Sequence, residues 1–307
     1  MQVTVAIPTY NRSRTLRQTL EGIAKQDFPA DQFEVVVIDN NSTDDTRDVV
    51  AAFSGAVPAP RHVLESRQGL DHARNRGIAE AAGGIVLFAD DDILVAPDWI
   101  RQMLAPFAAD FAGDIGAVGG EVIPVFPDGL PPWVADWHSP LAFRLDAGPI
   151  PPGQSPMGAN LAFRKAVFTE VGLFHTELDR AAGSFFSGGD TEMIRRVRAA
   201  GKTVWFAPAA AVRHQRPASR TTLRYAARHA FDSARSRVID RAERSGGTAY
   251  LLTRLPLNLA KALGFFILSG LSFLVFPRPG SAKKSLVRAW RSCGYVYQAS
   301  RSLAGKR

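Results

Sequence analysis

Three consecutive aspartates, Asp90, Asp91 and Asp92, directly follow a short apolar run of the sequence. In an extended chain alternate side chains share a face, so we expect Asp90 and Asp92 to point the same way and Asp91 the other. Two carboxylates on one side suit Mg²⁺ or Mn²⁺, hard ions that prefer oxygen ligands and leave positions open for phosphates. The alternative is a solvated acidic turn before the helix expected near Trp99, although a helix cap does not require three like charges.

The elements that must position these carboxylates follow from the apolar pattern. Apolar runs over 3–8, 33–38, 62–64 and 85–88 alternate with helical spacing over 15–25, 44–53 and 70–82. This alternation predicts an α/β fold with a mostly parallel central sheet covered by helices on both faces. Ligands of such sheets bind outside the carboxyl ends of the strands, which is where Asp39 and the three aspartates fall. Beyond an irregular stretch rich in Pro, Gly and Trp over 126–156, we expect an ordered segment over 158–163, a helix over 191–200 and a strand over 204–207.

The charge of the chain is unevenly spread. Of 37 Lys and Arg and 29 Asp and Glu, the residues from 218 onward hold 17 basic and 3 acidic ones, which leaves 20 basic and 26 acidic residues before them. We therefore expect two domains, an acidic α/β domain over 1–217 and a helical, basic and apolar appendage over 218–307. Such an appendage suits nucleic acid or an anionic membrane, and its apolar content favours the membrane and no nucleic acid.

The composition also limits the compartment. A single cysteine, Cys293, excludes an intramolecular disulfide and a cysteine-based zinc site, and fits a reducing compartment. The first residues lead directly into an apolar, β-branched run rather than a signal peptide. We therefore expect the protein at the cytoplasmic face of a membrane.

Six segments of the chain form one series. They are Pro-Thr-Tyr-Asn-Arg at 8–12, Val-Ile-Asp-Asn-Asn-Ser-Thr-Asp at 37–44, Ala-Arg-Asn-Arg-Gly at 73–77, the aspartates at 90–92, Gly-Ala-Asn-Leu-Ala-Phe-Arg at 158–164, and Gly-Gly-Asp at 188–190. In this order, over roughly residues 1–215, they resemble family 2 glycosyltransferases of the GT-A fold. The resemblance implies a transferase that uses a nucleotide diphosphate sugar donor.

The resemblance assigns a first group of residues to the donor. These are Pro8 and Thr9 beside the nucleotide, Asp39 on the nucleobase, Arg67, Gly69 and Arg74 near the base and phosphates, and Asp90 with Asp91 at the diphosphate. Purely structural roles remain as alternatives for several of these residues. The Pro8 segment would also serve as a helix-entry turn, Asp39 as a helix cap, and Arg67 as a partner in a surface salt bridge.

The resemblance assigns the metal and the base to a second group. Asp92, with Asp90, would contact Mg²⁺ or Mn²⁺, and His214 would be a further metal or phosphate contact, although a lone His is more often structural. Asp190 would be the general base that deprotonates the acceptor hydroxyl opposite the leaving group, which gives inversion. The family commonly has Glu-Asp where this chain has Gly189 and Asp190. Asp190 would alternatively cap the following helix, and Glu192 is the reserve base.

The implied function is inverting, metal-assisted transfer of a sugar to a glycan or a lipid-linked intermediate, as in cell-surface polysaccharide synthesis. Trp133, Trp137 and His138 would stack on the acceptor or belong to the core. A catalytically idle nucleotide-sugar-binding or scaffold protein in a membrane-bound assembly is the alternative. A nucleotidyltransferase would need a Gly-rich basic loop after the first strand, which the Pro-Thr-Tyr-Asn sequence is not. Neither a dinucleotide fingerprint nor a complete phosphate-binding loop is found.

The segment 255–276 is apolar apart from Asn258 and Lys261, with an uninterrupted stretch over 262–276. A span needs about 20 apolar residues, so this segment is marginal. Basic residues at both ends favour a helix that lies on or dips into one leaflet; a spanning helix and an ordinary core or dimer helix remain alternatives. Arg220, Arg224 and Arg228 form one stripe on a helix, either solvated or in contact with phosphate headgroups.

Overall fold

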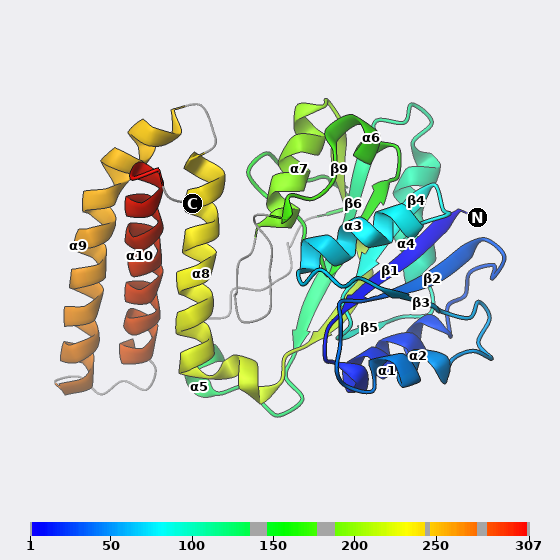
Figure 1. Ribbon diagram of the computed structural model, residues 1–307, viewed down its shortest axis with the longest axis horizontal. Helices are drawn as coiled ribbons and strands as arrows, with labels where there is room; N and C mark the ends of the chain where they lie inside the picture. The colour runs from blue at the N-terminus through cyan, green and yellow to red at the C-terminus, as the bar shows by residue number, and fades with distance from the viewer. Residues whose placement is uncertain (1, 136–145, 177–187, 243–245, 275–280, 306–307) are drawn as a thin grey trace. The chain divides into compact units, whose positions relative to one another are not determined.

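The computed structural model describes residues 2–135, 146–176, 188–242, 246–274 and 281–305. The chain forms two compact units (Figure 1). The first comprises the described residues within 1–125, 140–179 and 189–215, and the second those within 126–139, 180–188 and 216–307. Each unit is described by itself below. Trp137 and His138, expected near the acceptor, lie outside the described residues.

The first unit is built on a nine-stranded sheet with the strand order β3-β2-β1-β4-β8-β6-β9-β5, and β7 pairs with β9. The strands are β1 Val3–Thr9, β2 Phe33–Asp39, β3 Arg61–Leu64, β4 Ile85–Ala89, β5 Ile93–Val95, β6 Ile115–Val125, β7 Gly148–Pro149, β8 Asn160–Arg164 and β9 Thr203–Gln215. Strands β3, β2, β1 and β4 are parallel, as the sequence pattern predicts. Beyond them β8 runs antiparallel to β4 and β6, so the complete sheet is mixed.

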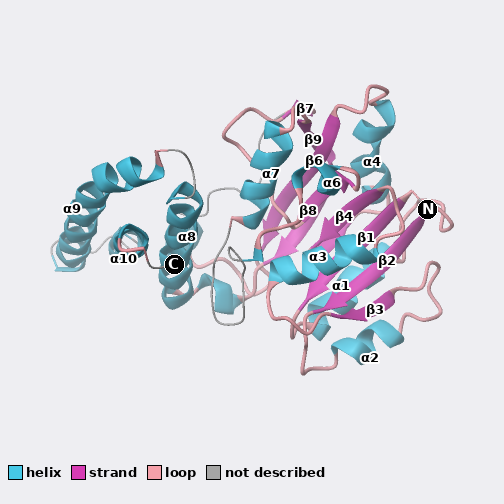
Figure 2. Cartoon of the chain, turned by 45° about the horizontal axis from the view of Figure 1, so that its top comes forward, coloured by secondary structure: helices cyan, strands magenta, loops and turns pink. Residues whose placement is uncertain are grey.

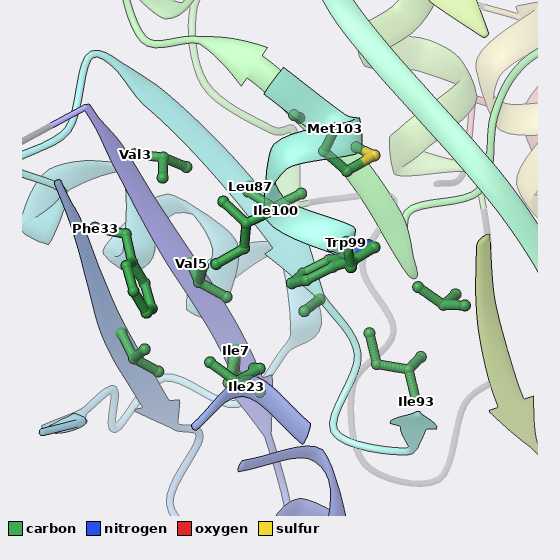
Figure 3. Close-up of a cluster of buried hydrophobic side chains, with 14 of the residues drawn as sticks. Val3, Val5, Ile7, Ile23, Phe33, Leu87, Ile93, Trp99, Ile100 and Met103 are labelled. Atoms are coloured by element: carbon green, nitrogen blue, oxygen red, sulfur yellow. The ribbon is translucent and has the colours of Figure 1, made fainter. Parts of the chain in front are cut away.

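Helices cover both faces of this sheet (Figure 2). They are α1 Ser13–Ile23, α2 Thr46–Ala51, α3 Leu70–Glu80, α4 Trp99–Ala109, α6 Val167–Val171 and α7 Gly189–Ala199. Alternate residues of β1 enter different clusters, because Val5 packs with α1 and α4 whereas Ala6 packs with α3 and α7. Figure 3 shows the first cluster, in which Trp99 and Met103 of α4 lie against the sheet. Burial on both faces explains the continuous apolar runs of these strands.

The second unit is helical. It contains α5 Pro132–Ala135, a 3₁₀ turn at Ala218–Thr221, α8 Leu223–Ala242, α9 Gly247–Leu274 and α10 Ser281–Leu303. Helix α10 packs against α8 so closely that a Cβ on Gly294 would lie 2.2 Å from the carbonyl oxygen of Phe231. Trp133 and Val134 of α5 join Ala226, Ala230 and Val287 in one core cluster of this unit. Trp133, a candidate acceptor contact, is therefore a buried core side chain here.

Helix α9 leaves much of its apolar surface uncovered. Leu259, Leu263 and Ile267 have exposed fractions of 60%, 64% and 54%. Among the residues that the structure describes, one helical segment, Gly247–Ser272, is long enough and apolar enough to cross a membrane. Soluble proteins normally bury most such side chains, and a contiguous exposed apolar face marks a surface that contacts a partner or a membrane.

Candidate functional site

The strand order brings the candidate residues to one edge of the sheet. Strands β2, β1 and β4 are parallel neighbours, so their carboxyl ends, at Asp39, Thr9 and the aspartates after Ala89, lie at the same edge. The Thr9 hydroxyl donates a hydrogen bond of 2.8 Å to Asp91 Oδ2. This contact joins two segments that lie 82 positions apart in the chain.

Asp90 and Asp92 meet His214 in one cluster. His214 Nε2 lies 3.0 Å from Asp92 Oδ1 and 3.6 Å from Asp90 Oδ2, and one ligand atom of each residue lies within 4.8 Å of the others. The antiparallel pairing of β5 with β9 causes this, because it places His214 opposite Ile93, the residue after Asp92. Asp90 and Asp92 thus face His214 while Asp91 faces Thr9, the alternation expected of an extended segment.

The donor set of this cluster fits a divalent cation. Two carboxylates and an imidazole are ligand types that divalent ions accept, and His214 Nδ1 is a buried nitrogen without a hydrogen-bond partner among the described residues. Burial lowers the pKa of His214, but hydrogen bonds and charges from Asp90 and Asp92 outweigh it and raise that pKa above its ordinary value. Burial raises the pKa of Asp90, and the contact with His214 outweighs it, so that pKa is lowered. The cluster therefore attracts positive charge.

Arg12 is a site residue to which the sequence analysis assigned no role. Its guanidinium nitrogen donates to Asp91 Oδ1 at 2.8 Å and to Asp92 Oδ2 at 3.0 Å. The Coulombic attraction of Asp91 raises the pKa of Arg12. Burial raises the pKa of Asp91, although Arg12 opposes this effect. Asp91, expected to contact the donor, is thus held by Thr9 and Arg12. No local signal predicts the contact, because 79 positions separate Arg12 from Asp91.

The edge of β2 is shaped by hydrogen bonds to Asp39 and Asn40. Asp39 Oδ1 accepts from the Ser42 amide at 2.8 Å, and Oδ2 lies 3.0 Å from His62 Nε2. Asn40 was not assigned a role from the sequence. Its amide group donates to the carbonyl oxygens of Glu65 and Arg67 and accepts from the Gly69 amide at 2.7 Å. Asp39 therefore stabilises the turn after β2, and Asn40 fixes the loop that leads to α3.

Arg67 and Gly69 lie in that loop. Arg67 forms two parallel bonds of 2.9 Å to the Glu65 carboxylate, and this hydrogen bonding lowers the pKa of Glu65 to about 2. The Arg67 side chain is otherwise largely exposed, which agrees with the alternative that Arg67 forms a surface salt bridge. Gly69 precedes α3 with φ of 149°, a left-handed conformation that favours glycine. Pro8 is buried within β1, opposite Ile38 of β2.

Asp190 lies in the first turn of α7, which begins one residue earlier, at Gly189. Its Oδ2 accepts from the Gly158 amide at 3.0 Å, and its Oδ1 lies 2.7 Å from an Arg74 nitrogen. These contacts lead to the segment before β8 and to α3, rather than to the amides of α7, so they differ from those of a simple helix cap. The Asp190 side chain keeps 28% of its surface exposed, enough for contact with a substrate.

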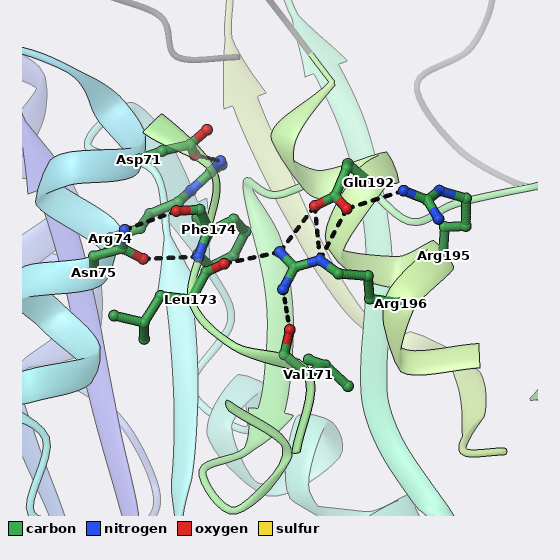
Figure 4. Close-up of polar contacts among 9 residues, drawn as sticks. All are labelled: Asp71, Arg74, Asn75, Val171, Leu173, Phe174, Glu192, Arg195 and Arg196. Atoms are coloured by element: carbon green, nitrogen blue, oxygen red, sulfur yellow. Dashed lines mark hydrogen bonds and ion pairs between the residues drawn. The ribbon is translucent and has the colours of Figure 1, made fainter. Parts of the chain in front are cut away.

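Glu192, the reserve base, is engaged elsewhere. Both of its oxygens bond to Arg196 at 2.8 to 2.9 Å, and one bonds to Arg195 at 3.1 Å. Arg196 in turn donates to the carbonyl oxygens of Val171 and Leu173 (Figure 4). Glu192 is 4% exposed. Its contacts hold α7 against the segment after α6, which favours Asp190 as the base.

Arg74 forms an ion pair with Asp190, and its charge also acts on Asp90 of the Asp90–Asp92–His214 cluster. It is buried and pairs with Asp190. It also pairs with Asp71 at 2.9 Å and lies 5.3 Å from the centroid of the Phe174 ring, and Figure 4 draws these residues. Its charge also contributes to the lowered pKa of Asp90. The Asp90 amide hydrogen-bonds the carbonyl oxygen of Ala159, the residue after Gly158, at 3.4 Å. The candidate base and the candidate cation ligands therefore adjoin across strands β4 and β8.

A mixed sheet with carboxylates gathered at the ends of its first parallel strands agrees with the GT-A glycosyltransferase fold that the resemblance implies. The family model described as glycosyl transferase family 2 matches residues 4–172, which is more than half of the chain. The protein therefore belongs to glycosyl transferase family 2. The family and the fold class expected from the sequence are both confirmed.

Individual relatives agree with this assignment. Glycosyltransferase AglE of Haloferax volcanii is 29% identical over 206 residues, 67% of this chain and 64% of that protein, so the match spans less than two thirds of AglE. The succinoglycan biosynthesis protein ExoM of Rhizobium meliloti is 26% identical over 96% of this chain and 92% of its own length. The mannosyltransferase PcManGT of Pyrobaculum calidifontis, solved with GDP-Man and Mn²⁺, shares the fold with a TM-score of 0.61 and 23% identity over 100% of this chain and 88% of that chain.

Proposed function

We propose that this protein transfers a sugar from a nucleotide diphosphate donor to an acceptor hydroxyl, with inversion at the transferred carbon. The observation that carries the proposal is the juxtaposition of the Asp90–Asp92–His214 cluster with Asp190: the Gly158 amide bonds Asp190, and the carbonyl oxygen of the next residue, Ala159, accepts from the Asp90 amide. PcManGT, which has the same fold, binds a nucleotide sugar and Mn²⁺. We assign the transferase to residues 1–217 and donor contacts to Pro8, Thr9, Asp39, Arg67 and Gly69, with Arg74, Asp90 and Asp91 at the diphosphate.

Asp190 is the base in this proposal. A base must lie within hydrogen-bond reach of the hydroxyl proton that it accepts. The two contacts of Asp190, to the Gly158 amide and to Arg74, orient its carboxylate, and 28% of the side-chain surface remains exposed. Attack from that side, opposite the diphosphate, displaces the leaving group in one step and inverts the configuration.

Asp90, Asp92 and His214 would hold Mg²⁺ or Mn²⁺. Bound there, the ion would supply positive charge beside the diphosphate as it leaves. Thr9 and Arg12 hold Asp91, and Arg12 also holds Asp92, so the carboxylates are oriented before any ligand binds. Such preorganisation limits the rearrangement needed during the reaction.

The acceptor in this proposal is a growing glycan or a lipid-linked intermediate. ExoM, whose name places it in succinoglycan biosynthesis, matches this chain over nearly its whole length, including the helical second unit. A protein that builds a glycan on a lipid works best where the lipid is, at a membrane surface. The helical unit has the properties that such a location requires.

Two variants test the reaction. Asp190→Asn keeps the size of the side chain but replaces one carboxylate oxygen by an amide NH₂ and removes the base, so turnover should fall by about a thousandfold or more while donor binding persists. Thermal-shift measurements with UDP-, GDP- and dTDP-sugars, with and without Mn²⁺, first identify the donor. Retention of full turnover by both Asp190→Asn and Asp92→Ala would overturn the proposal. Donor binding by the unaltered protein without turnover on any acceptor would instead favour the idle scaffold.

We also propose that helix α9 lies on the cytoplasmic face of an anionic membrane, without crossing it. Helix α10 packs along α9 and carries Lys283, Lys284, Arg288 and Arg291, whose charges would be costly inside a bilayer beside a spanning helix. The exposed leucines and isoleucine of α9 are instead suited to the boundary between headgroups and acyl chains. Cations on the same hairpin would bind the anionic headgroups.

Vesicle flotation tests this orientation. The full chain should float with phosphatidylglycerol vesicles, and the double change Leu263→Glu and Ile267→Glu should lower the bound fraction by about tenfold or more. Alkaline carbonate should extract the protein from membranes, because it releases peripheral proteins and retains spanning ones. Resistance to carbonate would favour the spanning alternative. Failure of the unaltered chain to float with the vesicles would favour a core or dimer helix.

A further inference from the structure

Asp71, on the first turn of α3, is a buried carboxylate for which neither the sequence analysis nor the proposed reaction has a role. It is 2% exposed, and its Oδ1 accepts a hydrogen bond of 2.9 Å from Arg74. The same Arg74 nitrogen lies 2.7 Å from Asp190 Oδ1. One guanidinium nitrogen is thus shared by two carboxylates, one from α3 and one from α7.

The carboxylate of Asp71 occupies the space beside Gly189. A Cβ on Gly189 would lie 2.4 Å from Asp71 Oδ2 and 3.0 Å from its carboxyl carbon, a separation that real Cβ atoms do not adopt. Asp71 is too short to swing away without leaving Arg74. No residue with a side chain fits at position 189 while Asp71 stays where it is. The resemblance to the family expects a Glu at this position, directly before the base.

A second glycine supports the same group of charges. A Cβ on Gly158 would lie 2.3 Å from an Arg74 nitrogen and 2.5 Å from both oxygens of Asp190. The chain Asp71–Arg74–Asp190 therefore rests on the backbone at two points where only glycine fits. The Phe174 ring lies against the Arg74 guanidinium, and Asn75 fixes Phe174 by bonds of 2.9 Å to its amide and to its carbonyl. The fixed Phe174 ring therefore restricts the position of the Arg74 guanidinium.

We propose that Asp71 is a positioning residue for the base. It supplies from α3 the second carboxylate beside Asp190, in the space that the absent side chain of residue 189 leaves open, and fixes Arg74 so that Asp190 faces the acceptor. Asp71 and Asp190 share one guanidinium nitrogen, so Asp71 holds Arg74 where it also orients Asp190. Without Asp71, Arg74 would lose one of the two carboxylates that hold it. This inference rests on the proposed function of Asp190.

The test separates kcat from donor affinity. Asp71→Asn and Gly189→Ala should each lower kcat by about tenfold or more, because small displacements of a catalytic group are costly, while the Kd for the donor rises by a smaller factor, about threefold or less, because Arg74 is also assigned to the diphosphate. Gly189→Ala keeps every charge, so it carries the test should Asp71→Asn not fold. Glu80→Gln, at the other end of the same helix, where Glu80 pairs with Arg61 and Arg76, is the matched control and should leave kcat unchanged.

A reciprocal exchange completes the test. Gly189→Glu alone should be nearly inactive, because its side chain collides with Asp71. The double change Asp71→Ala with Gly189→Glu returns a carboxylate to the same space from the other helix, and its kcat should exceed that of either single variant by about tenfold. Full kcat in both Asp71→Asn and Gly189→Ala, or no gain in the double variant, would overturn the role of Asp71. Full kcat in Asp190→Asn would instead overturn the assignment of the base itself.

Discussion

The sheet unit buries ion pairs near the ends of its strands, whereas the helical unit exposes a series of apolar side chains along α9. In the sheet unit, charged groups such as Arg74 and Asp92 are 5% and 2% exposed and lie against opposite charges. In the helical unit, apolar groups such as Leu263 are more than half exposed. Burying a charge is tolerated only with a partner, and exposing apolar surface is stable only where something covers it. The comparison teaches that the sheet unit places its buried charges against opposite charges, as a polar site requires, whereas the helical unit keeps apolar side chains exposed, as the proposed membrane contact requires.

The largest expected effect on the sheet unit alone follows from removing a candidate ligand of the cation. Asp92→Ala should lower turnover by about a thousandfold, equivalent to ~4 kcal/mol of transition-state stabilisation, because the ion loses a carboxylate ligand. Binding to phosphatidylglycerol vesicles should not change. Glu21→Ala, at an exposed position of α1, is the control. Loss of vesicle binding together with turnover would mean that the two units do not act separately.

Packing gives the next largest effect. Gly120→Ala places a Cβ 2.2 Å from the carbonyl oxygen of Ala210 and from Asn160 Nδ2, a buried amide that bonds β6 to β9. This change should destabilise the protein by ~2 to 3 kcal/mol. Gly264→Ala on α9 meets nothing within 4 Å. It should stabilise the helix by up to ~1 kcal/mol. Thermal unfolding measures the change in Tm of both variants. Equal changes in Tm would contradict the difference in packing between Gly120 and Gly264.

Protons and metal should compete at His214. The contacts with Asp90 and Asp92 outweigh burial and raise the pKa of His214, so without metal the imidazole keeps its proton to a higher pH than usual. A metal ligand must be neutral, so the affinity for Mn²⁺ should rise with pH through this raised pKa, by up to about tenfold per unit below it. Titration calorimetry between about pH 5.5 and 8.5 follows this rise. In His214→Gln the affinity should be lower and this step absent; an unchanged profile would exclude His214 as a ligand.

The smallest expected effect concerns single cations of the helical unit. Burial, and then the charges of Arg237 and Arg288, lower the pKa of Arg291, which indicates that these cations lie close together. Anionic headgroups would relieve this repulsion. Arg291→Gln should weaken vesicle binding by about fivefold, or ~1 kcal/mol, and the effect should fade at high salt. Arg61→Gln, in the sheet unit, is the control and should not change vesicle binding. Equal losses of vesicle binding in Arg291→Gln and Arg61→Gln would show that the location of the charge does not matter.

The sequence was sufficient for features that depend on local pattern. Apolar runs predicted β1 to β4, and the alternation of an extended segment predicted that Asp90 and Asp92 share a side. The insertion of β8 between β4 and β6 has no local signal, because pairing depends on contacts between distant segments. The same reason hides Arg12, Asn40 and Asp71, since each acts on a residue from another element. Glycines offered one indirect clue, because Gly189 stood where the resemblance expected a larger residue.

The pairing of β5 with β9 has a consequence for how the chain is made. His214 lies far beyond Asp92 in the sequence, on the last strand of the sheet unit. A chain emerging from the ribosome therefore presents its three aspartates long before their histidine exists. Arg12, synthesised earlier than all of them, is the countercharge available during that interval. The nascent protein can thus fold its first strands around a neutralised acidic end and acquire a complete cation site only as synthesis of this unit finishes.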